Sequence, residues 1–220
     1  MADKTDKKPL EQRSYMFEVR AEQDEEQGSI ITGRPIVYNS RADLGYFDEI
    51  IEGGALDRTD LTDVRFLVNH NMDMIPLARS RRNNGNSTML LTVDSEGMGI
   101  RVSLDTENNT EARALYSAVE RGDITGMSFL FTVRDESWEN IDTDHPTRRI
   151  TDIGTVIEVS AVTMPAYHAT EIYARSKEAV ETALNTLESV RQQRAKSLES
   201  DTKCDELELA KAKYEFKSKS

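Results

Sequence analysis

Short segments in which apolar and polar residues alternate recur along the first three quarters of this 220-residue chain. A period of two places successive side chains on opposite faces of a strand, so each segment predicts a half-buried β-strand. The segments are residues 15–20, 30–38, 64–68, 89–93, 100–104, 127–133 and 155–163. They predict a mainly β fold with helices (α+β), whose core is an antiparallel β-barrel or strongly curved sheet of six or seven strands.

One helix is predicted among these strands, between the cap positions Asn108 and Gly122. Its apolar residues have the spacing of one helix face: Ala112, Leu115 and Val119. Asn108 and Glu111 have the spacing of a capping box, and Gly122 stands where a C-terminal cap is expected. We therefore expect this helix to pack on the barrel.

The two ends of the chain differ in composition from the segment between them. Residues 1–13 are rich in charge and predict a disordered arm before a folded domain at residues 14–175. Residues 176–220 contain no glycine or proline and carry a helical stripe formed by Ala179, Val180, Ala183, Leu184, Leu187 and Val190. They predict a charged amphipathic helical tail that dimerises or docks on another protein, or else a marginal helix that is ordered only inside an assembly.

Charge and composition disfavour several classes of function. A net charge of -12 has the wrong sign for attraction to a phosphate backbone, so we expect no nucleic-acid partner. Cys204 is the only cysteine, and no Cys/His cluster has the spacing of a zinc site, so we expect neither disulfide nor metal nor other cofactor. The sequence has no long uncharged apolar run, so we expect neither a signal peptide nor a membrane partner.

His70 and Ser128 are candidates for nucleophilic catalysis. His70 is one of three histidines and follows the strand segment 64–68, whose parity places it on the inward face. Ser128 lies two residues after Gly126, at the start of the segment 127–133. A serine hydroxyl becomes a useful nucleophile when an imidazole accepts its proton. The simpler alternatives are a structural histidine at a strand end and an ordinary strand serine.

Glu158 is the third candidate because it interrupts an almost continuous apolar strand. A buried carboxylate requires a partner to offset the loss of its hydration. An imidazole facing Ser128 is one possible partner, and it would complete a set of nucleophile, base and orienting acid. An ion pair with Arg148, Arg149 or another cation is an equally good interpretation from spacing alone.

Motifs in these segments resemble a known family over residues 15–175. They are residues 33–39 (GRPIVYN), 47–51 (FDEII), 53–56 (GGAL), 67–71 (LVNHN), 121–123 (RGD), 126–129 (GMSF), Trp138 and residues 158–167 (EVSAVTMPAY). In order and spacing the sequence resembles the prohead (procapsid maturation) serine proteases of tailed bacteriophages, whose fold is similar to that of the herpesvirus assemblins. It departs from the commonest pattern at Leu130 and Ala78, where glycine is frequent.

The resemblance implies a catalytic triad. Ser128 would be the nucleophile, His70 the general base, and Glu158 the third member, in place of the second histidine of the assemblins. The rivals for the third position are His145, His168 and Asp152. By analogy with the arginine-assisted oxyanion hole of the assemblins, the pair Arg148 and Arg149 is a candidate for that role.

The resemblance also implies a biological role. The expected substrates are the scaffolding segment of the major capsid protein and the protease itself, which is a partner through autoproteolysis and as a possible homodimer. Both would be cleaved inside the assembling procapsid, in the host cytoplasm, and self-cleavage would remove the tail. The alternatives are an inactive scaffold or capsid-assembly chaperone with the same barrel, and an unrelated β-barrel binding module.

Overall fold

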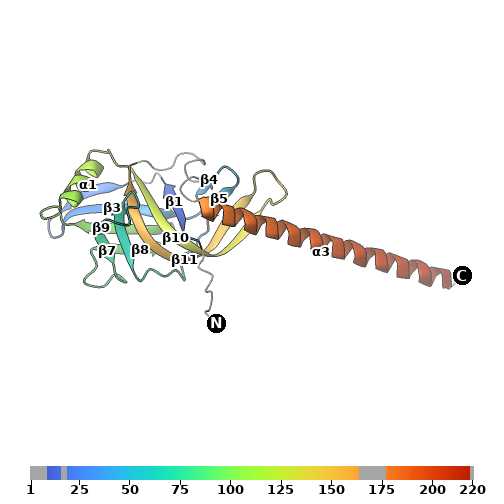
Figure 1. The fold of residues 1–220 in the computed structure, drawn as a ribbon. Helices are drawn as coiled ribbons and strands as arrows, with labels where there is room; N and C mark the ends of the chain where they lie inside the picture. Colours follow the sequence, from blue (N-terminus) through green and yellow to red (C-terminus); the bar gives the residue numbers. More distant parts are fainter. Residues whose placement is uncertain (1–8, 16–18, 164–176, 219–220) are drawn as a thin grey trace, which may run out of the picture.

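The computed structural model describes residues 9–15, 19–163 and 177–218, and this part of the chain is mostly β with two helices (Figure 1). The elements are β1 (Glu11–Tyr15), β2 (Arg20–Asp24), β3 (Gly28–Val37), β4 (Arg41–Asp43), β5 (Asp48–Ile51), β6 (Val64–Val68), β7 (Ala78–Ser80), β8 (Met89–Asp94), β9 (Gly97–Leu104), α1 (Thr110–Glu120), β10 (Gly126–Glu139), β11 (Thr147–Val162) and α3 (Lys177–Ser218). Among the described residues, no helix is long and apolar enough to cross a membrane.

The strands form two sheets that pack through a shared apolar core. The order in the seven-stranded sheet is β1-β10-β11-β5-β4, with β6 pairing with β11 and β7. The four-stranded sheet has the order β2-β3-β9-β8. Ile31 and Val102 from the small sheet share one buried cluster with Phe66, Phe129 and Val156 from the large sheet. The predicted mainly β class is confirmed, but the sheets of the described residues do not close, so the barrel is not confirmed.

Most of the pairing is antiparallel, as predicted, and β11 supplies the exceptions. This long strand pairs antiparallel with β10, but it pairs parallel with β5 near one end and with β6 near the other. The same stretch of β11 that lies opposite Ser128 and Leu130 of β10 therefore lies beside β6 on its other edge. This arrangement brings three segments that are far apart in the sequence to one place.

Helix α1 agrees with its prediction except at its first residue. The N-cap is Asn109, whose side chain accepts hydrogen bonds from the amides of Glu111 and Ala112, and not Asn108. Asn108 instead bonds Asp105 in the preceding turn. Gly122 has φ +76°, the left-handed conformation that a residue just after a helix commonly adopts. The three predicted apolar residues are buried.

The tail forms one long helix, α3, whose first turns pack on the body of the protein. Val180 and Ala183 are buried in a small cluster with Leu44 and Phe47. Further along, the Arg191 side chain donates to the backbone oxygen of Ile141 over 2.6 Å. Figure 1 shows the rest of α3 extending away from the sheets. Part of the predicted apolar stripe therefore packs against the body of the same chain.

The N-terminal prediction was wrong for residues 11–13. These residues belong to β1, an edge strand, although their charges suggested a disordered arm. Glu11 and Arg13 are almost completely buried because they pair with other charges, and an ion pair of this kind leaves no signal in a hydrophobicity pattern. One strand was predicted over residues 15–20, of which residues 16–18 lie outside the described residues. Tyr15 is the last residue of β1 and Arg20 the first residue of β2.

Candidate active site

Ser128 lies in β10, two residues after the glycine that begins the strand, and its hydroxyl is bonded to His70. The distance from Ser128 Oγ to His70 Nε2 is 2.6 Å. Ser128 is fully buried, between β1 on one side and β11 on the other. A serine hydroxyl and an imidazole nitrogen at this separation are within reach for direct proton transfer.

His70 lies in the turn that follows β6. Asn69 and His70 have φ of +52° and +57°, a left-handed conformation that is uncommon outside glycine and must be held by its surroundings. The Asn69 amide donates to Ala161 O (2.9 Å), and the Asn69 side chain accepts from the Thr163 amide (3.0 Å). The structure brings His70 to Ser128, and it is the turn that directs the side chain there and not the parity of the strand.

Glu158 has the imidazole partner that was one of its two predicted partners. Its Oε1 makes a very short contact with His70 Nδ1, and its Oε2 accepts from the Ser160 hydroxyl over 2.6 Å. Glu158 is completely buried, so these contacts take the place of the hydrogen bonds that its carboxyl group would make to water. The structure therefore places Ser128, His70 and Glu158 in one continuous hydrogen-bonded chain.

Sequence reasoning missed Ser160, which supports two members of this chain. Its hydroxyl donates to Glu158 and accepts from the backbone amide of His70 over 3.0 Å. Ser160 follows Glu158 by two residues, so both side chains lie on the same face of β11. That spacing was the signal that could have identified it.

The other candidates for the third member of the site have other partners or lie outside the described residues. His145 Nε2 is 3.3 Å from Asp48 and 3.7 Å from Asp43, and these are the one group of three potential metal ligands among the residues that the structure describes. Asp152 is held by Arg58 and Arg134. His168 is outside the described residues.

Arg148 and Arg149 are engaged by carboxylates, so the oxyanion-hole analogy gains no support. Arg149 pairs with Glu139 and Glu52. Arg148 is buried and bonds Glu11, Glu49 and Glu136. Burial alone would lower the pKa of Arg148, but the neighbouring carboxylates, with Glu11 foremost, raise it above its ordinary value.

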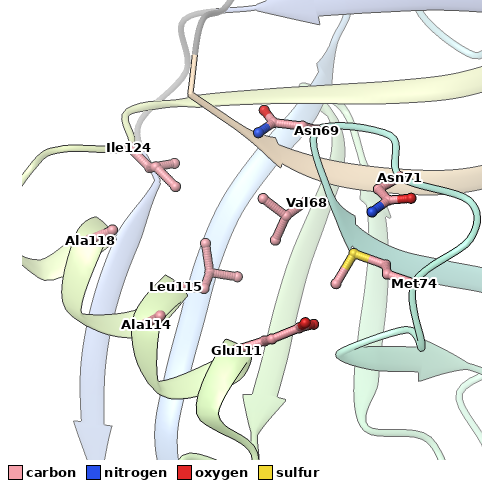
Figure 2. A pocket seen from close by; sticks show the side chains of 9 residues that line it. All are labelled: Val68, Asn69, Asn71, Met74, Glu111, Ala114, Leu115, Ala118 and Ile124. Carbon is pink, nitrogen blue, oxygen red and sulfur yellow. The ribbon is translucent and has the colours of Figure 1, made fainter.

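A pocket of about 430 Å³ lies beside the triad, between α1 and the turn after β6 (Figure 2). Val68 and Asn69, which directly precede His70, form one wall, and Leu115 and Ala118 of α1 form the opposite wall. The lining is mostly apolar, with the carboxylate of Glu111 and the amides of Asn69 and Asn71 as polar groups. None of Ser128, His70 and Glu158 lines this pocket.

A family model described as caudovirus prohead serine protease matches residues 16–185. No curated protein matches the chain. Among solved structures, the bacteriophage T4 capsid assembly protease gp21 is similar with a TM-score of 0.35 and 11% sequence identity, covering 69% of this chain and 98% of that one.

Proposed function

The chain belongs to the caudovirus prohead serine protease family, and from this we propose that it is a serine endopeptidase in which Ser128 is the nucleophile and His70 the base. The observation that carries the proposal is the 2.6 Å contact between Ser128 Oγ and His70 Nε2. Glu158 supports the assignment, because it contacts the other ring nitrogen and has a second hydrogen bond of its own.

The proposed reaction is acyl transfer to Ser128 followed by hydrolysis. His70 Nε2 takes the hydroxyl proton while Ser128 Oγ attacks the carbonyl carbon of a peptide bond. The imidazolium then gives this proton to the nitrogen of the leaving amine as the peptide bond breaks. His70 next removes a proton from water, which attacks the acyl-enzyme, and the proton returns to Ser128. No metal or other cofactor takes part in this mechanism.

Glu158 stabilises the imidazolium and holds the ring so that Nε2 faces Ser128. Because Glu158 is buried, its interaction with a charged imidazole is stronger than it would be in water. Ser160 acts as a positioning residue that fixes both the carboxylate and the backbone of His70.

The proposed substrates are the scaffolding segment of the major capsid protein and the protease itself. The family description supports a role in the maturation of phage proheads, so we place the reaction inside the procapsid in the host cell. Self-cleavage in the tail is supported by the course of α3, which extends away from the sheets beyond its first packed turns.

The rival function is that of an inactive capsid-assembly protein. It is favoured by the burial of Ser128 under β1 and by the length of α3. A protease and a scaffold differ in whether Ser128 is required for processing, so one substitution distinguishes them.

The test uses the precursor of the major capsid protein from the same phage. It is incubated with the wild-type chain, with Ser128→Ala and with Ser103→Ala, whose hydroxyl bonds Gln27 O in the other sheet. Time-resolved mass spectrometry should show cleavage of the precursor by the wild type and by Ser103→Ala, and none by Ser128→Ala. Equal cleavage by Ser128→Ala, or cleavage by none of the three proteins, would reject the proposed function.

A further inference from the structure

Strand β1 covers the nucleophile in the manner of a bound peptide. It is the edge strand of the large sheet and pairs antiparallel with β10, with Ser14 opposite Ser128 and Arg13 opposite Phe129 (Figure 1). Addition of an extended segment to a sheet edge is a common way for a protein to bind a peptide. In this chain, the edge of β10 that carries Ser128 is already occupied by the chain's own residues 11–15.

The contacts at Ser128 place β1 in a nonproductive position. Ser128 Oγ lies 2.7 Å from the backbone oxygen of Arg13 and 2.8 Å from the Ser14 hydroxyl. The Ser128 hydroxyl has one proton, and the Arg13 carbonyl competes for it with His70 Nε2. A carbonyl that is to be attacked presents its carbon to the nucleophile and its oxygen to other donors. The Arg13 carbonyl instead presents its oxygen to Ser128 and excludes another peptide.

Buried charges hold β1 in this position. Arg13 Nη2 is 2.6 Å from Glu49 Oε2 and 2.7 Å from Glu11 Oε2, and Arg13 Nε makes a further, very short contact with Glu49. On the other side, Arg148 reaches Glu11 over 2.7 Å and Glu49 over 2.9 Å. Burial alone would lower the pKa of Arg13, but Glu49 and Glu11 raise it above its ordinary value.

These charges divide between β1 and the body of the protein. Glu11 and Arg13 come from β1, whereas Glu49, Glu136 and Arg148 come from β5, β10 and β11. Without β1, this cluster keeps two carboxylates and one guanidinium. It therefore carries an excess negative charge next to the exposed edge of β10. It therefore fits a strand that carries a cation at the position of Arg13.

We propose that the edge of β10 is the binding site for the substrate strand and that β1 is an internal inhibitor occupying it. In the bound strand, Glu49 selects a basic residue and Arg148 selects an acidic one. The ligand class is an extended peptide with an acidic residue two positions before a basic one, as in Glu11 and Arg13. This inference rests on the proposed peptidase function and adds both its regulation and its substrate class. Activation requires β1 to leave β10.

The first test loosens β1 in the full chain. Arg13→Ala removes the guanidinium but leaves Glu49 paired with Arg148. The control Arg34→Ala breaks a two-bond arginine–carboxylate pair with Asp94 in the small sheet, which is more exposed than the pairs of Arg13. The readouts are the rate at which a fluorophosphonate labels Ser128 and the hydrogen exchange of the β10 amides.

We expect Arg13→Ala to label at least roughly tenfold faster than the wild type and to exchange faster along β10, because lost charged hydrogen bonds shift an equilibrium by that order. Arg34→Ala should match the wild type. Unchanged exchange and unchanged or slower labelling in folded Arg13→Ala would overturn the inference. Faster exchange with no labelling of any protein would instead support release of β1 and reject the proposed peptidase.

The second test locks β1 in place and does not depend on Arg13→Ala folding. Gln12 and Leu130 are opposite each other in the β1–β10 register, so Gln12→Cys with Leu130→Cys, in a Cys204→Ser background, can form a disulfide across the pair. Oxidised glutathione closes it by taking two electrons and two protons from the thiols. We expect the oxidised protein not to label at Ser128 and the reduced protein to label. Equal labelling of both forms would show that β1 need not leave.

The third test asks whether the site prefers a bound strand with a basic residue at the position of Arg13. A synthetic peptide with the sequence of residues 9–15 is added to Arg13→Ala during labelling. It should slow the labelling of Ser128 and the exchange of β10, whereas the same peptide with alanine in place of its arginine should have a weaker effect. Equal effects of the two peptides, or no effect of either, would overturn the assignment of Glu49 as the partner of a basic residue in the bound strand.

Discussion

The backbone amide of His70 donates to the side-chain hydroxyl of Ser160, 3.0 Å away. This bond joins a turn with left-handed backbone conformation to the strand that carries Glu158. Since the same hydroxyl donates to Glu158 over 2.6 Å, Ser160 couples the position of the base to that of the acid. The proposed triad is thus held by a fourth residue that takes no part in the proposed proton transfer.

Replacing Ser160 with alanine should lower kcat roughly 10- to 100-fold with little change in KM. The substitution removes the hydroxyl that bonds a buried carboxylate oxygen and a backbone amide, and leaving such a group without a partner costs about 1–3 kcal/mol of free energy. Peptidase kinetics on the capsid precursor measure both constants. Ser160→Thr, which keeps the hydroxyl, should recover part of the rate. A kcat equal to that of the wild type in Ser160→Ala would show that the contact has no role in positioning.

Glu158→Gln should lower kcat by roughly 10³- to 10⁴-fold while the fold is kept. The amide has nearly the shape of the carboxylate, but it neither stabilises the imidazolium nor fixes the tautomer that presents Nε2 as an acceptor to Ser128. Steady-state kinetics and circular dichroism check the two parts of this expectation. A folded Glu158→Gln protein with a wild-type rate would remove Glu158 from the triad and leave it a structural residue.

The buried charges around β1 predict a pH-dependent stability. Burial alone would raise the pKa of Glu11, but Arg148 and Arg13 hold it below its ordinary value of 4.5. A depressed pKa in the folded state gives stability that is complete above the ordinary value and is lost as the pH falls through the folded one. Relative to Glu11→Gln, the wild type should therefore be more stable by about 3 kcal/mol near neutral pH, and the difference should shrink in acid.

Urea unfolding of the two proteins from neutral pH down into the acid range measures this difference. The comparison removes the contributions of other carboxylates that titrate in both proteins. A stability difference that stays constant below pH 4.5, or that grows there, would contradict the assignment of Glu11 to a favourable buried pair.

Gly97→Ala should prevent stable folding of the small sheet. Gly97 has φ +138°, and a Cβ there would lie 2.0 Å from the backbone oxygen of Ile36 on the neighbouring strand, so the loss in unfolding free energy should exceed about 4 kcal/mol. Gly28→Ala is the matched control, because Gly28 also has positive φ but open space around it, and should cost only about 1–2 kcal/mol. Similar melting temperatures for the two variants would contradict this expectation.

The apolar strands could be predicted from the sequence because their pattern reflects burial directly. The bounds of β6 agree with the predicted residues 64–68, and β8 differs by one residue. Strands β4, β5 and β7 were missed because three or four residues are too few to establish an alternation. Strand β1 was missed because its buried side chains are charged, and their partners Glu49 and Arg148 lie far along the chain.

For the candidate site, the sequence predicted that Glu158 needs a partner, but it could not choose between an imidazole and an arginine. The choice depends on the register of β11 against β6 and β10, which is a property of the whole sheet. Nothing in the local sequence shows that Arg148 pairs with Glu49 and Glu11 instead of Glu158. No local sequence pattern could have predicted that β1 covers Ser128, because the two segments lie far apart in the sequence.

The most direct measurement of the central claim is the labelling of Ser128 by a fluorophosphonate, located by peptide mass spectrometry in the wild type, Arg13→Ala and His70→Ala. The account predicts an adduct on Ser128 in folded wild type and Arg13→Ala, none after unfolding in urea, and a rate lower by roughly 10²- to 10⁴-fold in His70→Ala. No adduct in either folded protein, or a rate that does not depend on His70, would contradict it.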